Sequence, residues 1–157
     1  MTTGEPVTGT LGGEGARRRP PRFNHVAMSV PADLLGPEGR AELCAFYGDT
    51  LGWRELPTET IDHRRLVFGV HTVQQFVFLI ADSEPMRCPR LDHFGLSVGT
   101  EEELDEILAA CRRWQARDPR VDLIDKQVED HGPIVITNMY VRFLLPMMVE
   151  IQHWEFR

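Results

Sequence analysis

The sequence lacks several features that would assign it to a class at once. No apolar run approaches the roughly 18 residues of a membrane-spanning helix. The segment before Phe23 has no apolar core of the kind that a secretory signal requires. Cysteine is scarce: Cys44, Cys88 and Cys111 are odd in number and widely spaced, unlike a disulfide framework or a zinc ribbon. We therefore expect a cytoplasmic protein with reduced thiols.

Positive charge is in deficit as well, with 17 Lys and Arg against 24 Asp and Glu and a net charge of −7. Such a chain repels phosphate backbones and anionic lipids, so we expect neither nucleic acid nor a membrane as a partner. A small-molecule substrate fits, even an anionic one, because one local cation can outweigh the net field. The 157 residues are 42% hydrophobic and 26% charged, which is typical of one globular domain.

Apolar residues are nearly missing from positions 1–20, which hold five Gly and four Thr. We expect this segment to be a flexible tail, because it cannot bury enough surface to offset the entropy of ordering. Residues 21–157 are predicted to form a single domain. Within it, residues of about 22–84 and about 90–157 follow the same order of elements, so the domain consists of two modules.

Each module is predicted to be a strand, a helix and three more strands. The opening strands, 23–30 and 91–98, match position by position: large apolar, Asn or Asp, His, apolar, small, Met or Leu, Ser, Val. The other predicted strands are 53–56, 65–70 and 74–81 in module 1 and 121–124, 134–143 and 147–156 in module 2. Helices are predicted from Pro37 to Gly52 and from the Thr100/Glu103 capping box to Asp118. A lone βαβββ module leaves one sheet face uncovered, which favours an α+β fold of two paired modules.

Two histidines, His25 and His93, occupy equivalent places in this repeat. Approximate two-fold symmetry would point both imidazoles into one cavity. The last strand places Glu150 among apolar neighbours, and a buried carboxylate needs a partner, which a cation held by the histidines would supply. The alternatives are hydrogen-bonded structural histidines and a Glu that faces outward from an edge strand.

These residues, with the helix end Phe-Tyr-Gly-Asp-Thr-Leu-Gly-Trp at 46–53, resemble the vicinal oxygen chelate superfamily over about residues 22–156. That group includes glyoxalase I, methylmalonyl-CoA epimerase, type I extradiol dioxygenases, and fosfomycin and bleomycin resistance proteins. The resemblance implies two βαβββ modules that form a curled mixed sheet around a central cavity, with His25, His93 and Glu150 as metal ligands. Phe78 stands where glyoxalase I and the epimerase have a fourth ligand, and it cannot coordinate. Two His and one carboxylate are typical of non-heme Fe(II) oxygenases.

A second resemblance is to the extradiol dioxygenases. His131, Tyr140 and Glu150 keep that family's intervals of nine and ten residues, which implies that Tyr140 hydrogen-bonds a substrate hydroxyl and that His131 lies beside the substrate. The family's turn before the Glu and its acid–base His on the fourth strand are missing. The alternatives are a core aromatic role for Tyr140 and an exposed turn position for His131.

The function predicted from these patterns is that of a divalent-metal enzyme acting on a small oxygen-chelating molecule, such as a catechol or hydroxy-ketone. Dioxygenase-like chemistry is favoured over that of a glyoxalase-type lyase or an isomerase. Fe(II) is the favoured metal, with Mn, Zn, Ni or Co as alternatives. Tyr140 and His131 are the candidate catalytic residues, and Phe76, Phe78 and Arg142 the candidate substrate-binding residues. The resemblance also implies a homodimer.

The competing hypothesis is a drug-binding resistance protein of the bleomycin-sequestering type, without catalysis. The acidic charge would suit a cationic ligand, and the aromatic rings of Phe76, Phe78 and Trp154 could stack on it. Such a binder does not need the two His and the Glu. Thiol transfer to an epoxide antibiotic ranks last, because the potassium loop and cationic pocket of that family are not evident.

Overall fold

The computed structural model describes residues 21–157, so the predicted flexible tail, residues 1–20, lies outside the described residues. The first module contains β1 (His25–Val30), the 3₁₀ helix η1 (Ala32–Leu35), α1 (Pro37–Leu51), β2 (Arg54–Glu55), β3 (Arg65–Gly69) and β4 (Phe76–Ala81). The second contains β5 (His93–Ser97), α2 (Glu101–Gln115), β6 (Asp122–Asp130), β7 (Ile134–Arg142) and β8 (Met148–Phe156). The predicted repeat of βαβββ modules is confirmed.

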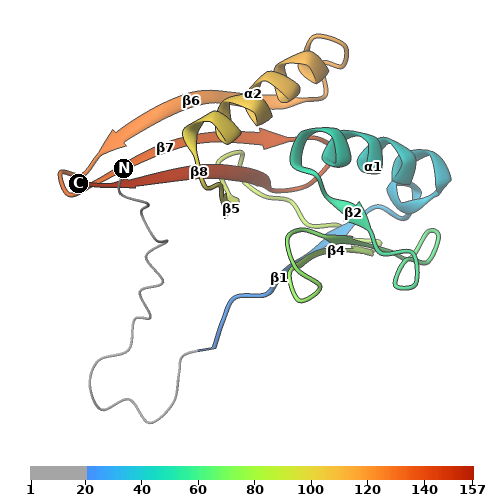
Figure 1. Cartoon of the computed structure of the whole chain (residues 1–157). Coiled ribbons are helices and arrows are strands. Elements are labelled where there is room, and N and C mark those ends of the chain that lie inside the picture. Colours follow the sequence, from blue (N-terminus) through green and yellow to red (C-terminus); the bar gives the residue numbers. More distant parts are fainter. Residues whose placement is uncertain (1–20) are drawn as a thin grey trace.

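The strands form two four-stranded sheets, in the orders β1-β4-β3-β2 and β5-β8-β7-β6. In each module the first and last strands run parallel and the remaining neighbours run antiparallel. The predicted α+β class is therefore confirmed. Over residues 21–157 the two sheets remain separate and are not closed around a cavity (Figure 1).

The helix boundaries follow from local chemistry. Pro37 opens α1, where its missing N–H costs nothing, and Gly52 ends it in the left-handed region at φ 68°. The N-cap of α2 is Thr100, whose hydroxyl accepts from the Glu103 amide while the Glu103 carboxylate accepts from the Thr100 amide. Both starts and the end of α1 lie where the sequence predicts them, whereas α2 ends at Gln115, three residues before Asp118.

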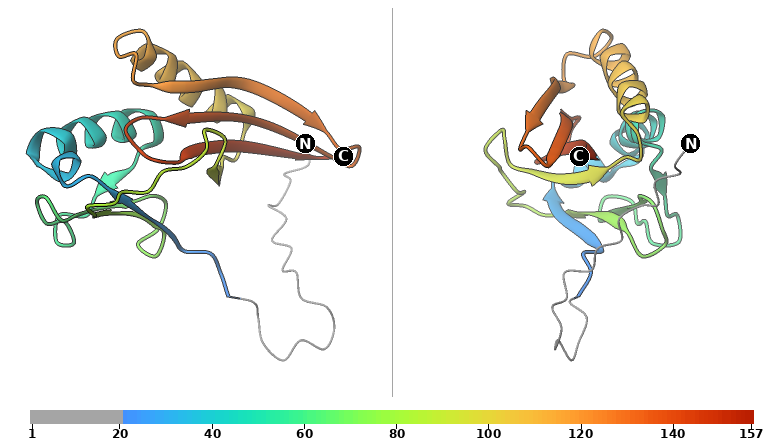
Figure 2. Two further views of the ribbon diagram at one scale, coloured as in Figure 1. Left: turned by 180° about the vertical axis from the view of Figure 1, so that it is seen from behind. Right: turned by 60° about the vertical axis from the view of Figure 1, so that its left-hand side comes forward.

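The two helices lie next to each other in all views, and the sheets extend away from them (Figures 1 and 2). Trp114 of α2 packs edge-on against Phe46 of α1 at 5.5 Å between ring centroids, and its indole N–H donates to Asp49 at 2.7 Å. One hydrophobic cluster runs through both modules and includes Phe68 and Val149. Each sheet therefore has one face turned to this core and one face without a helix.

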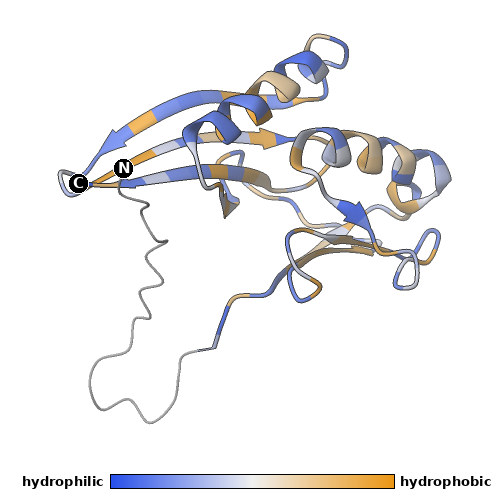
Figure 3. Ribbon diagram, in the orientation of Figure 1, coloured by the Kyte–Doolittle hydropathy of each residue, from blue (hydrophilic) through white to orange (hydrophobic). Residues whose placement is uncertain are grey.

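The strand β6 is longer than predicted, since it continues past Ile124 to Asp130. Its second half, Asp-Lys-Gln-Val-Glu-Asp, is hydrophilic (Figure 3) because β6 is the sheet edge, where charged side chains discourage pairing with other chains. A register shift between Ile124 and Gln127 interrupts its ladder with β7. None of the helices described here has the length and apolar character needed to cross a membrane.

Candidate metal centre

The helix-free face of the second sheet carries the polar candidates of module 2. Glu150 on β8 lies opposite Tyr140 on β7 and opposite Gly95 on β5, and directly opposed residues share a face. The neighbours Val149 and Ile151 point the other way, into the hydrophobic cluster. Glu150 is only 5% exposed. Its carboxylate is thus held inside the protein, on the face that the helices leave free.

His93 and Glu150 come together on this face. The His93 Nε2 and Glu150 Oε2 atoms are 3.4 Å apart. The other ring nitrogen, Nδ1, lies 2.7 Å from the carbonyl oxygen of Leu91, so it carries the proton and donates it there. In the neutral ring this leaves the Nε2 lone pair directed toward Glu150. A backbone carbonyl that fixes the tautomer in this way is the usual support of a metal-binding histidine.

The placement of these two atoms suits a cation. An imidazole nitrogen and a carboxylate oxygen 3.4 Å apart can both bind one ion at bonds of about 2.0–2.2 Å. Gly95 helps to keep the space beside them open: a Cβ atom at this position would lie 3.3 Å from Glu150 Oε2. The donor set, one nitrogen and one oxygen, favours a transition metal.

Tyr140 and His131 are linked to Glu150 by two residues that the sequence did not single out, Asn138 and Glu129. The Asn138 amide nitrogen lies 3.2 Å from Glu150 Oε1, 3.0 Å from Glu129 Oε1 and 3.4 Å from the Tyr140 hydroxyl. His131 Nε2 lies 3.3 Å from Glu129 Oε2. Burial and the hydrogen bond to Glu150 raise the pKa of Tyr140 to about 12, so its hydroxyl keeps its proton at neutral pH.

Arg142 lies on β7 two residues beyond Tyr140, on the same face of the sheet. Its guanidinium donates to Asp122 at 2.9 Å. Asp122 also accepts from Arg90, and this second guanidinium is the main reason that the pKa of Asp122 lies below its usual range. The charge of Arg142 is therefore already paired, and its binding to substrate stays a prediction.

The helix-free face of the first sheet carries aromatic rings around His25. His25, Phe76 and Phe78 line a cavity of about 430 Å³ there, and Glu59 and Arg65 lie at the same cavity. The His25 ring stacks on Phe76 with 4.6 Å between centroids, and its Nδ1 lies 2.8 Å from the Asn24 side-chain oxygen. Phe78 is opposite Ala27, two residues after His25, just as Glu150 is opposite Gly95, two residues after His93. Phe78 thus occupies the place in module 1 that Glu150 occupies in module 2.

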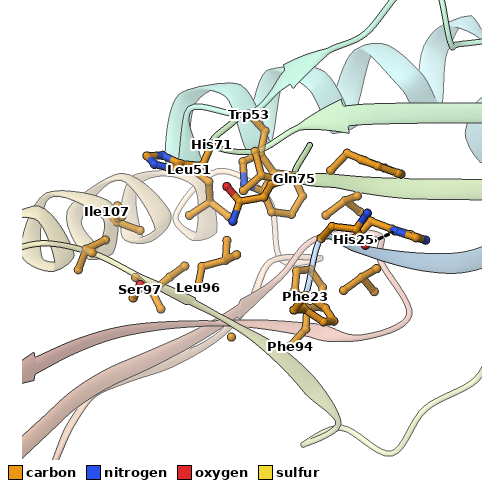
Figure 4. A pocket seen from close by; sticks show the side chains of 18 residues that line it. Phe23, His25, Leu51, Trp53, His71, Gln75, Phe94, Leu96, Ser97 and Ile107 are labelled. Atoms are coloured by element: carbon orange, nitrogen blue, oxygen red, sulfur yellow. Dashed lines mark hydrogen bonds between the residues drawn. The ribbon is translucent and has the colours of Figure 1, made fainter. Parts of the chain in front are cut away.

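The two modules place their histidines on different sheets. Within residues 21–157, no group of three or more His, Cys, Asp or Glu side chains is close enough to hold one metal ion. His25 lies at the junction of the modules, where it also lines a cavity of about 380 Å³ with Trp53 and Phe94 (Figure 4). The structure therefore assembles two of the three predicted ligands, and His25 stays a prediction.

Comparisons with known proteins identify the fold. Neither a protein-family model nor a curated protein sequence matches this chain. Among solved structures, lactoylglutathione lyase from Agrobacterium tumefaciens is similar, with a TM-score of 0.59 at 16% identity, covering 87% of this chain and 96% of the lyase. A glyoxalase/bleomycin resistance protein from Albidiferax ferrireducens has a TM-score of 0.57 at 14% identity, with coverages of 83% and 98%.

A third similar structure contains a metal. It is a point mutant of the fosfomycin resistance protein FosX from Listeria monocytogenes, complexed with Mn(II) and 1S,2S-dihydroxypropylphosphonic acid. Its TM-score is 0.58 at 14% identity, and the match covers 84% of this chain and 91% of FosX. At such low identity the likeness concerns the fold. The chain has the fold of these glyoxalase and resistance-protein structures, as its sequence predicts.

Proposed function

We propose that this protein is a divalent-metal-dependent enzyme acting on a small substrate that chelates the metal through oxygen atoms. The observation that carries the proposal is the pair of His93 Nε2 and Glu150 Oε2, 3.4 Å apart on the helix-free polar face, where Glu150 is buried and His93 is exposed. A dioxygenase-like reaction is favoured, because Phe78 removes the fourth ligand expected of a glyoxalase or an epimerase. Fe(II) is the proposed metal, with Mn, Zn, Ni or Co as alternatives.

The residues of this face have separate roles in the proposal. His93, Glu150 and His25 would hold the metal, which supplies a Lewis acid and a template for two substrate oxygens. Tyr140, protonated at neutral pH, has one O–H donor, which would turn from Glu150 to a substrate oxygen when substrate binds. His131, beside Glu129 at the end of the β6–β7 hairpin, accepts or returns a proton.

The proposed active form is a homodimer. In one chain, His25 lies on the first sheet and the His93–Glu150 pair lies on the second. We propose that the first module of one chain covers the second module of the other, so that His25 of one copy completes the ligand set of its partner. Phe76 and Phe78 would then face the polar residues around Glu150 of the partner and contact the apolar part of the substrate.

We propose a cytoplasmic location. The three cysteines are free, which suits a reducing compartment, and burial raises the pKa of Cys44 to about 11 and that of Cys111 to about 12.

The competing function is sequestration of a drug without catalysis. Trp154 and Phe156, with ring centroids 6.3 Å apart, are exposed at the end of β8 and could stack on a flat ligand. Calorimetry on metal-free protein separates the two functions. Tight binding of a bleomycin-type drug that persists in His25→Ala and Glu150→Gln would favour sequestration.

Metal analysis of the full chain tests the enzymatic proposal. We expect about one divalent ion per chain after purification without chelator or after reconstitution with Fe(II) or Mn(II). His93→Ala and Glu150→Gln should each lose it, because each removes one of the paired donors. His153→Ala is the matched control, since His153 lies opposite Thr137 on the other face of β8 and should leave the metal content unchanged. Wild-type protein that takes up no metal under either condition contradicts the proposal.

A further inference from the structure

Asn138 lies at the centre of the polar face, among the candidate site residues. It is on β7 two residues before Tyr140, opposite Gln152 on β8 and Gln127 on β6, and it is only 2% exposed. A buried amide in a sheet interior is costly unless its polar atoms are paired. The partners of this amide therefore indicate what the residue does.

The amide nitrogen faces three oxygens: Glu129 Oε1 at 3.0 Å, Glu150 Oε1 at 3.2 Å and the Tyr140 hydroxyl at 3.4 Å. The reversed amide would point its carbonyl oxygen at two carboxylates, which only accept hydrogen bonds, so the orientation is fixed by its neighbours. The Asn138 oxygen is buried and has no hydrogen-bond partner among the described residues. The side chain thus donates its two N–H groups to carboxylates and leaves its buried oxygen without a hydrogen bond. A residue that served only to fill space would not need these donors, so we infer that Asn138 acts on the carboxylates.

The two oxygens of Glu150 consequently have different surroundings. Oε1 accepts from Asn138, whereas Oε2 faces His93 Nε2 at 3.4 Å and the open space beside Gly95. We propose that Asn138 is a positioning residue that restricts Glu150 to binding the metal through Oε2 alone. The inference rests on the proposed function, because it concerns the metal that His93 and Glu150 would hold.

This restriction matters for the number of open positions on the metal. A carboxylate that binds through both oxygens occupies two positions, and one that binds through a single oxygen occupies one. A substrate that chelates through two oxygens needs two adjacent vacancies. By engaging Oε1, Asn138 keeps one more position available to water or substrate.

The test counts the water ligands of bound Mn(II) in the full-length protein, by electron spin-echo spectroscopy in deuterated water. In Asn138→Leu, which keeps the volume but removes both donors, Oε1 is free to bind and the metal should carry one water fewer than in the wild type. The affinity for 4-nitrocatechol should fall about tenfold. Asn138→Ser, whose hydroxyl is too short to reach Oε1, provides a smaller second variant with the same expected loss. Gln127→Leu is the matched control, because Gln127 is the exposed cross-strand neighbour of Asn138.

The outcomes separate this inference from the proposed function. Wild-type protein that binds no Mn(II) overturns the proposed function and this inference with it. Wild-type and Asn138 variants that bind Mn(II) with the same number of waters and the same 4-nitrocatechol affinity overturn this inference alone. Loss of one water in both Asn138 variants, with the Gln127→Leu count unchanged, supports it, because a general loosening of the sheet would not change the denticity of one carboxylate selectively.

Discussion

At the residue scale, the missing side chain of Gly95 leaves room beside the carboxylate of Glu150. Gly95 is not in the left-handed region, so its backbone does not require glycine, yet a Cβ atom there would lie 3.3 Å from Glu150 Oε2. We predict that Gly95→Ala folds normally and weakens Mn(II) binding about tenfold, because the methyl group narrows the space beside the carboxylate. Isothermal titration measures this. Gly48→Ala is the control, since its Cβ would meet no heavy atom closer than 3.6 Å; equal affinity in both variants would mean that the gap beside Gly95 is not the metal position.

The two tyrosines give a prediction that depends on pH. Burial raises the pKa of Tyr140 to about 12 and that of Tyr47 above its usual range. We predict no tyrosinate absorbance at 295 nm below about pH 11 in the folded protein, whereas the urea-unfolded chain should ionise near pH 10. Because the unfolded chain loses the Tyr140 proton at a lower pH than the folded protein does, the contribution of Tyr140 to stability is complete below pH 10 and declines as the pH rises to about 12. A folded-state titration of both tyrosines near pH 10 would contradict the burial of the Tyr47 hydroxyl and the hydrogen bond between Tyr140 and Glu150.

The sequence predicted part of the centre and missed part of it for a physical reason. His93 and Glu150 could be selected because the repeat and the apolar flanks of the last strand mark them. Asn138 and Glu129 could not, since their roles depend on which residues of β6, β7 and β8 lie opposite one another. The pairing of β6 with β7 includes a register shift between Ile124 and Gln127, which the pattern of apolar residues does not indicate.

At the scale of elements, one side chain of α1 is hydrogen-bonded to the segment that follows β7. The Tyr47 hydroxyl donates to the Phe143 carbonyl at 3.0 Å and accepts from the Phe143 amide at 3.1 Å. We predict that Tyr47→Phe lowers the free energy of unfolding by about 2–4 kcal/mol, because it leaves two buried backbone groups unpaired. Urea denaturation measures the change. Tyr140→Phe, whose hydroxyl is only partly buried, is the comparison and should cost less; equal losses would argue against the Phe143 contact.

Most elements were predictable from the sequence because their signals are local. Pro37, Gly52 and the Thr100 capping box define three helix ends, and the repeated opening strands define β1 and β5. The second half of β6 was not predictable, because its polar residues have no alternation of their own. It is a strand because β7 pairs with it from Gln127 to Asp130.

At the scale of the whole molecule, the helices join the two modules while the free faces of the sheets remain apart. A cavity on the first sheet and a polar face on the second are thus available to another copy of the chain. If the proposed homodimer is correct, each copy offers both halves of a centre. Mixed variants can then test whether His25 completes the centre of its own chain or that of its partner.

We predict that His25→Ala and Glu150→Gln chains, inactive in metal binding alone, regain binding when they are unfolded and refolded together. Random pairing makes half of the dimers mixed, and each mixed dimer has one intact centre, so about a quarter of the wild-type metal content should return. Metal analysis of the purified mixture measures it. No recovery, in protein shown by sedimentation to form mixed dimers, would place His25 with the pair of its own chain instead.

The equivalence of Phe78 and Glu150 has a consequence for the kind of molecule that such a centre selects. The two modules have the same layout but opposite chemistry at this register position, a phenyl ring in one and a carboxylate in the other. In the proposed homodimer, a small molecule between these two surfaces would turn its hydroxyl or carbonyl edge toward Glu150 and its apolar edge toward Phe78. A ring with polar groups along one edge could contact both surfaces favourably, whereas a uniformly hydrophilic polyol could do so only on the Glu150 side.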